Sequence, residues 1–169
     1  MIKKNFNLFA HFEDQFLSHS DKEILCTEDN FSYSYSKLNK ISAQIANCLI
    51  NSGASENDRV TVQIEKSPWG LALYLACLRS GLVFHPINMA YKKKEVEYFL
   101  SNAEPTVVIC DNSNEHIYKN TINKKLTKQI FILNKDGSGS LMNKANSASE
   151  EFSTIHRNHN DLAALLYSS

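Results

Sequence analysis

The sequence has no excess of charge of either sign, since 18 lysines and arginines balance 18 aspartates and glutamates in 169 residues. A neutral chain lacks the main electrostatic attraction for nucleic acid or for an anionic membrane, so we expect neither partner. It also has no uninterrupted apolar run of about 18 residues, which predicts no membrane span. No apolar segment follows Lys3 and Lys4, so the N-terminus does not resemble a secretory signal, and we expect a cytoplasmic protein.

Cysteine pairs of the C-x-x-C type are also absent. The four cysteines, Cys26, Cys48, Cys77 and Cys110, are widely spaced, and three of them lie in apolar surroundings. This pattern predicts free, buried and reduced thiols in a reducing compartment.

Neither of the common glycine-rich phosphate motifs, G-x-G-x-x-G and G-x-x-x-x-G-K-[ST], occurs. Weaker candidates have simpler interpretations. Gly137-Ser138-Gly139 has no strand-to-helix context and is interpreted as a flexible turn. The segment 156–161 holds histidines and an aspartate but too few partners for a closed metal site, so we expect a solvated loop. Lys92–Lys94 precedes acidic residues and indicates a solvated helix start, and His85 at a strand end is expected to be structural.

The composition, 43% hydrophobic and 21% charged, is typical of a globular protein, and the length suits one domain with a sizeable core. Strand and helix patterns alternate four times from residue 58 onward. The expected helices are 5–17, 36–51, 69–80, 95–103 and 115–126, and the expected strands are 24–27, 31–35, 59–64, 82–84, 106–110, 129–133 and 162–167. This alternation predicts an α/β fold with an open, mostly parallel sheet and helices on both faces.

Local signals place several of these elements. Glu28–Asn30 is typical of a turn, so the two strands around it form a hairpin candidate. Ser67 and Pro68 are the residues preferred at the cap and the first position of a helix. Residues 134–159 are rich in asparagine and serine, which indicates a surface loop with one helical turn near 141–144.

The last apolar run, Leu162–Tyr167, is predicted to be one more buried strand, and it leads into Ser168 and Ser169. A strand that enters a loop of small residues is a common way to hold phosphate, because the loop exposes backbone N–H groups. The end of the chain is therefore the candidate site, although only its first residues are present.

Several blocks, in order and with consistent spacing, resemble the adenylate-forming acyl-CoA synthetase superfamily, the AMP-binding enzymes. They include Gly53-Ala54 followed by Asn57-Asp58-Arg59-Val60, and Asp161 through Ser169. The other blocks are 7–9, 31–38, 62–68, 71–81, 86–91, 97–105 and 136–141. Those at 62–81 and 86–91 resemble the malonyl-CoA synthetase branch in particular.

The resemblance implies that the chain is a partial N-terminal AMP-binding domain over 1–169, the incomplete first subdomain of such an enzyme. Its parts would be 5–57 with a helix, hairpin and helix, 58–133 with βα repeats, 134–160 as a surface loop, and 161–169 as a strand into the phosphate loop. Tyr167, Ser168 and Ser169 match the first three positions of that nucleotide-binding loop. No catalytic residue and no metal ligand of the family falls within the chain.

The resemblance also implies a two-step ligase of fatty acid metabolism. Carboxylate and ATP with magnesium give an acyl-adenylate and pyrophosphate, and coenzyme A then displaces AMP to give the thioester. The expected carboxylate is malonate or methylmalonate, and the 169 residues alone are expected to be inactive. Two alternatives remain: a ligase for another carboxylate (a fatty acid, an aryl acid or an amino acid), and a non-catalytic α/β interaction module.

Overall fold

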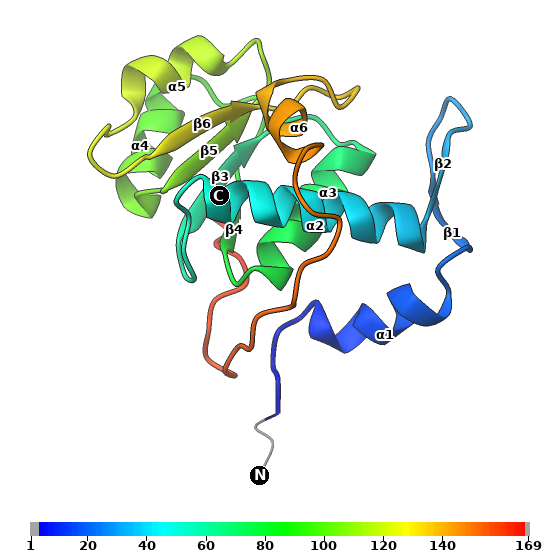
Figure 1. Ribbon diagram of the computed structural model, residues 1–169. Helices are drawn as coiled ribbons and strands as arrows, with labels where there is room; N and C mark the ends of the chain where they lie inside the picture. The colour runs from blue at the N-terminus through cyan, green and yellow to red at the C-terminus, as the bar shows by residue number, and fades with distance from the viewer. Residues whose placement is uncertain (1–3, 168–169) are drawn as a thin grey trace.

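The computed structural model describes residues 4–167, and its centre is a parallel sheet of four strands (Figure 1). The strands are β3 (Arg59–Gln63), β4 (Val83–Pro86), β5 (Val107–Cys110) and β6 (Gln129–Ile132), in the spatial order β4-β3-β5-β6. In the register, Val60 lies opposite Phe84 of β4 and Val107 of β5. The predicted α/β fold with a parallel sheet is confirmed.

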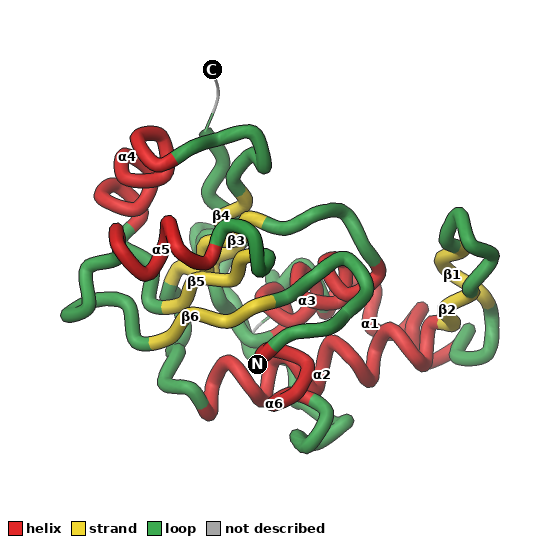
Figure 2. The backbone as a smooth tube through the Cα atoms, turned by 90° about the horizontal axis from the view of Figure 1, so that it is seen from above, coloured by secondary structure: helices red, strands yellow, loops and turns green. Residues whose placement is uncertain are grey.

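Helices cover both faces of this sheet, as Figure 2 shows from above. The helices α2 (Tyr35–Asn51), α3 (Pro68–Arg79) and α6 (Ser140–Ala145) lie on one side, and α4 (Lys93–Ala103) and α5 (Glu115–Thr121) on the other. The reason is the handedness of parallel crossovers. The chain moves one way from β3 to β4 and the opposite way from β4 to β5 and β6, so right-handed connections place their helices on opposite faces.

Two helices begin at serine caps, and the cap at Ser67 is the one that the sequence predicted. Ser34 Oγ accepts a hydrogen bond from the Lys37 backbone N–H at 3.1 Å, and Ser67 Oγ accepts one from the Gly70 N–H at 3.1 Å. Pro68 occupies the first position of α3, where its missing N–H costs nothing. Helix α5 is shorter than predicted: it ends at Thr121 because Ile122 adopts an extended conformation, with φ −60° and ψ 144°.

The first helix also differs from the prediction. It was expected from residue 5, but α1 spans Ala10–Ser18. Residues before it are held by Asn7, which is almost fully buried. Its amide nitrogen donates to the Leu78 and Ile155 carbonyl oxygens at 2.8 and 2.9 Å. These tertiary hydrogen bonds outweigh the helical spacing of the apolar residues.

The predicted hairpin is confirmed as β1 (Glu23–Cys26) and β2 (Ser32–Ser34), which pair antiparallel and extend away from the main sheet (Figure 1). Residues 134–160 form the expected loop, and its one helix is α6. The loop is fastened to α3, because the Ile155 N–H donates to the Arg79 carbonyl and the Arg79 guanidinium donates to the Phe152 carbonyl, both at 2.9 Å.

The final segment is the main correction. Residues 162–167 are not a buried strand but an extended segment along the outer edge of β4. The Phe84 N–H donates to the Ala163 carbonyl at 3.1 Å, and the Leu165 N–H donates to the Phe84 carbonyl at 2.9 Å. Leu162 is 59% exposed and Leu166 71% exposed. The apolar run predicted burial, but within residues 4–167 no element covers the far side of this segment.

Among the same residues, no helix is long and apolar enough to cross a membrane.

Candidate functional site

Ligands of open α/β sheets usually bind at the carboxyl ends of the strands, at the point where neighbouring connections leave in opposite directions. Here that point lies between β3 and β5, because β3 connects toward β4 and β5 connects toward β6. The residues that follow these two strands therefore decide whether the usual crevice is open.

Gln63 fills this crevice. Its amide nitrogen donates to the backbone carbonyls of Asn88 at 2.8 Å and Tyr91 at 3.2 Å, and its Oε1 accepts a hydrogen bond from the Tyr118 hydroxyl at 2.9 Å. Gln63 and Tyr118 are fully buried, and burial raises the pKa of the Tyr118 hydroxyl. The protein's own hydrogen-bonding groups therefore occupy the space next to the end of β3, which favours another part of this edge for a ligand.

The adjacent part of the edge, beyond β4, is reached by the final segment. At its end, the Tyr167 ring packs against Phe99 of α4, with ring centroids 4.8 Å apart, and against His85 of β4 at 5.5 Å. The predicted site residue Tyr167 therefore lies at the carboxyl edge of the sheet, with 38% of its surface exposed. The other two predicted site residues, Ser168 and Ser169, lie outside the described residues.

His85 has no solvent exposure. Its Nδ1 lies 2.8 Å from the Thr61 hydroxyl oxygen, and its Nε2 is buried without a hydrogen-bond partner within residues 4–167. Burial, with a smaller contribution from the charge of Arg59, lowers the pKa of the imidazole to about 4, so His85 is neutral at pH 7. It is part of the core, as the sequence predicted, and it also contacts the candidate site residue.

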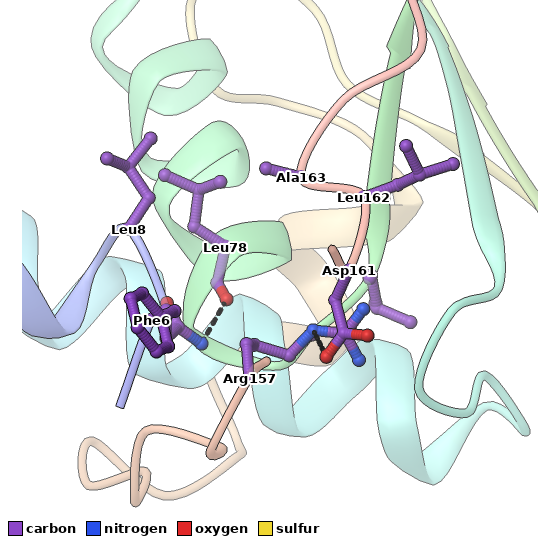
Figure 3. Close-up of a pocket in the computed structure, with 10 residues that line it drawn as sticks. Phe6, Leu8, Leu78, Arg157, Asp161, Leu162 and Ala163 are labelled. Carbon is purple, nitrogen blue, oxygen red and sulfur yellow. Dashed lines mark hydrogen bonds and ion pairs between the residues drawn. The ribbon is translucent and has the colours of Figure 1, made fainter. Parts of the chain in front are cut away.

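The loop around Arg157 is not the solvated loop that was predicted. Arg157 is almost fully buried, and its guanidinium lies 3.5 Å from carboxylates of both Glu56 and Asp161 and donates to the Asn57 side chain at 2.5 Å. Figure 3 shows Arg157 beside Asp161. The cavity beside it has a volume of about 40 Å³. That is room for a few water molecules. The cluster therefore fastens the final segment to the fold. His156 and His159 are exposed as expected, and no three His, Cys, Asp or Glu side chains among residues 4–167 are grouped to hold a metal.

The remaining candidates behave as predicted. Lys92–Lys94 are exposed at the start of α4, where Glu95 accepts a hydrogen bond from the Lys92 backbone N–H at 3.1 Å. Gly137-Ser138-Gly139 forms a turn in which Asp136 accepts hydrogen bonds from the N–H and hydroxyl of Ser138 at 2.9 and 2.6 Å. A groove of about 850 Å³ separates the hairpin from the start of α3; Phe31, Trp69 and Lys135 are among its lining residues.

Sequence analysis missed Gln63, Thr61 and Tyr118. The available signal was the alternation in β3, where Thr61 and Gln63 alternate with the apolar residues of a predicted strand. Buried polar groups require partners. Those partners lie 24 and 55 residues away along the chain, so the sequence pattern alone could not identify them.

The parallel order, the closed crevice and the aromatic contact at the end of the final segment define a class: a doubly wound α/β domain with its candidate site at the edge of β4. The chain belongs to the AMP-binding enzyme family, whose profile matches residues 12–169. The family-level resemblance found in the sequence is thereby confirmed.

Solved structures agree with this assignment. ATP-bound MatB from Rhodopseudomonas palustris has a TM-score of 0.92 and 40% identity to this chain; the match covers 98% of this chain and 33% of that one. The anthranilate CoA ligase AuaEII, at 18% identity and a TM-score of 0.86 over 98% of this chain and 32% of its own, shows the same fold. The chain thus spans about a third of the length of these structures.

Among curated relatives, the nonribosomal peptide synthetase ivoA of Emericella nidulans is 34% identical over 97 residues, which are 57% of this chain and 6% of that protein. Tyrocidine synthase 1 of Brevibacillus parabrevis is 29% identical over 102 residues, 60% of this chain and 9% of its own length.

Proposed function

We propose that the chain is the N-terminal part of an acid–thiol ligase that activates malonate or methylmalonate with ATP and transfers the acyl group to coenzyme A. One observation carries the proposal: the final segment runs along β4 and brings Tyr167 to the carboxyl edge of the sheet, in a chain that superposes on ATP-bound MatB with a TM-score of 0.92. On this proposal, 1–169 is a partial AMP-binding domain with the boundaries given above.

The choice of substrate rests on the likeness to MatB. The sequence blocks resembling the malonyl-CoA synthetase branch agree with the 40% identity to that protein over nearly the whole chain. Five relatives named as nonribosomal peptide synthetases match a shorter part, between 83 and 109 residues. An amino acid is therefore the less favoured substrate, and a non-catalytic module is not favoured.

On this proposal, the residues present form the start of a phosphate site, and they include no magnesium or coenzyme A site. Tyr167 is then the first residue of a phosphate loop, whose backbone N–H groups would bind anionic oxygens. When bound, ATP supplies the activated phosphoryl bond that the carboxylate attacks, with pyrophosphate as the leaving group. The proposal assigns magnesium ligands to none of residues 4–167, and it assigns the coenzyme A site to none of them. The 169 residues position Tyr167 and close the neighbouring crevice, so we expect no ligase activity from them alone.

The test is to express the complete coding region that carries this sequence and to measure AMP release with ATP, coenzyme A and a panel of carboxylates. Malonate and methylmalonate should be the preferred substrates over acetate, a long-chain fatty acid, an aryl acid and an amino acid. Preference for another carboxylate would refute the substrate assignment. A soluble, folded protein that releases no AMP with any of them would refute the ligase assignment.

A grafted enzyme gives a matched second test of the ligase assignment. Residues 1–169 replace the corresponding third of MatB from Rhodopseudomonas palustris, and the graft is compared with intact MatB. Malonate-dependent AMP release by the graft is expected if this chain supplies a working N-terminal part. Because the remaining two-thirds come from MatB, the graft reports on the N-terminal part and not on substrate choice.

A further inference from the structure

The face of the sheet toward α4 and α5 carries a row of buried polar side chains. Thr61 and Gln63 of β3 point to this face, and His85 of β4 pairs in register with Thr61. The hydrogen-bonding groups of Gln63 are satisfied by Asn88, Tyr91 and Tyr118. His85 differs, because one of its two ring nitrogens has a partner and the other has none within residues 4–167.

An unpaired polar atom in a core is costly, about 1–3 kcal/mol. A leucine at position 85 would avoid that cost and would still fill the space. The neighbours of the imidazole explain what the histidine can do. The Thr61 hydroxyl fixes the ring through Nδ1, while the aromatic rings that bound it belong to Phe99 of α4, with centroids 6.4 Å apart, and to Tyr167 of the final segment at 5.5 Å.

Tyr167 has few other attachments. The final segment makes two backbone hydrogen bonds to Phe84, and both lie before Leu166. Beyond that point, the contacts that hold the chain are ring contacts of Tyr167 with His85, Phe99 and Tyr98. His85 is the member of this group that is fully buried and also fixed by a hydrogen bond. It is therefore the rigid support on which the exposed ring rests.

We propose that His85 is a positioning residue for Tyr167, the first residue of the phosphate loop: Thr61 orients the imidazole, and the imidazole supports the Tyr167 ring. This inference deepens the proposed function and rests on it. His85 touches neither nucleotide nor carboxylate on this proposal, and its effect passes through Tyr167.

The test uses the 169-residue chain with fluorine-labelled tyrosine and ¹⁹F NMR. Each of the seven tyrosines contributes one signal, and comparison with Tyr167→Phe identifies the signal of Tyr167. In His85→Leu and in Thr61→Val, the Tyr167 signal should shift toward the position of unfolded fluorotyrosine, while the signals of Tyr33 and Tyr118 stay in place. His85→Gln, which keeps a hydrogen-bonding nitrogen, should restore part of the shift. His116→Gln, at an exposed histidine of α5, is the matched control and should change nothing.

Two results would overturn the proposal. A Tyr167 signal that is the same in the wild type and in His85→Leu would show that the imidazole does not hold the ring. A shift of all tyrosine signals together would show that His85 only stabilises the fold. If a variant of His85 fails to fold, ¹⁵N NMR of the wild-type His85 ring decides: a change in the imidazole signals is expected on Tyr167→Ala, which removes the neighbouring ring, and no change refutes the role.

Failure of the proposed function has a different signature. If the complete protein has no ligase activity but the Tyr167 signal still depends on His85, the proposed function is refuted. The proposal that His85 supports Tyr167 is then retained. In an active ligase, His85→Leu should raise the KM for ATP more than the KM for the carboxylate. An equal change in both contradicts a role at the phosphate loop.

Discussion

The Tyr118 hydroxyl donates a hydrogen bond to Gln63 Oε1 at 2.9 Å, and the pair closes the crevice between the carboxyl ends of β3 and β5. In sheets of this order that crevice is the usual place for a ligand. The closure leaves the edge beyond β4, where Tyr167 lies, as the candidate site.

Removing this hydrogen bond should destabilise the fold. Tyr118→Phe leaves Gln63 Oε1 buried without its donor, so we expect a loss of about 1–3 kcal/mol in the free energy of unfolding. Urea denaturation of the chain measures it. Tyr98→Phe, at a tyrosine that is 59% exposed, is the control and should cost under about 0.5 kcal/mol. Equal losses in the two variants would contradict the role given to the pair.

Much of this fold could be predicted from sequence, because its signals are local. Ser67 and Pro68 start α3 through contacts within three residues, and β-branched residues mark β3 and β5. The errors occur where a distant partner decides. Asn7 prevents an earlier start of α1 through carbonyls 71 and 148 residues away, and Arg157 is buried by Glu56 and Asn57. Such partners leave no periodic pattern in the sequence.

At the candidate site, too, the sequence predicts what depends on local signals and misses what depends on distant residues. Tyr167 could be found because the family resemblance covers it and because a strand pattern precedes it. The support beneath it could not, since it needs Thr61, His85 and Phe99 from three separate elements. The exposed outer edge of 162–167 was missed for another reason: an apolar run indicates hydrophobicity but not what covers it.

The stability of the fold should fall when the pH is lowered through the range in which His85 titrates. Its pKa is about 4 in the folded chain and 6.5 ordinarily, so the unfolded chain takes up the proton first. The contribution is complete above pH 6.5 and is lost between 6.5 and 4, for a total of about 3 kcal/mol. Urea denaturation across this range measures it.

His85→Leu removes the titrating group, so its stability should change less with pH over the same range. His116→Gln, which leaves His85 in place, should keep the wild-type slope. If His85→Leu and the wild type lose stability in parallel between pH 6.5 and 4, the imidazole is not the group responsible.

Arg79 is the last residue of α3, and its side chain contacts three other parts of the chain. Its guanidinium donates to the Asn39 carbonyl, the Ser42 hydroxyl and the Phe152 carbonyl at 2.9–3.1 Å, and it stacks over the Phe9 ring at 4.5 Å. Burial lowers its pKa to about 10, so it remains charged at pH 7. Arg79→Lys keeps the charge but cannot reproduce the fork of donors, and we expect a loss of about 2–3 kcal/mol in unfolding free energy.

An exposed charge provides the contrast to Arg79. Lys40 and Glu150 form an ion pair at 2.9 Å with both side chains more than half exposed. Lys40→Met should therefore change the unfolding free energy by less than about 1 kcal/mol. An Arg79→Lys variant that is no less stable than Lys40→Met would show that the hydrogen bonds of the guanidinium do not hold α2 and the segment around Phe152 against α3.

Gly137 should not tolerate a side chain. Its φ is +83°, and a Cβ atom there would lie 2.2 Å from the indole ring of Trp69. Gly137→Ala therefore combines backbone strain with a clash, and we expect a lower melting temperature. Gly70→Ala is the matched control: its Cβ would meet nothing closer than 3.4 Å, inside helix α3, where alanine is favoured. A Gly137→Ala variant as stable as Gly70→Ala would contradict the packing of the 136–139 turn on Trp69.

The four thiols should differ sharply in reactivity. Cys26 is exposed on β1, whereas Cys48, Cys77 and Cys110 are buried, which corrects the expectation that all four are buried. Burial raises the pKa of the Cys77 thiol and raises that of Cys110 to about 12, so neither forms a thiolate at pH 8. A thiol reagent should modify one cysteine rapidly in the native chain and all four in denaturant.

The variants assign the fast thiol and test the packing of the core at the same time. Cys26→Ser should abolish the fast phase, and Cys48→Ser should leave it unchanged, because Cys48 lies in α2 against α3. Two or more fast thiols in the native wild type would mean that α2, α3 or β5 is open to solvent. Cys77 and Cys110 lie on opposite sides of the sheet, in the two separate hydrophobic clusters. If Cys77→Ser or Cys110→Ser removes an extra fast phase, that variant identifies the face of the sheet that is open to solvent.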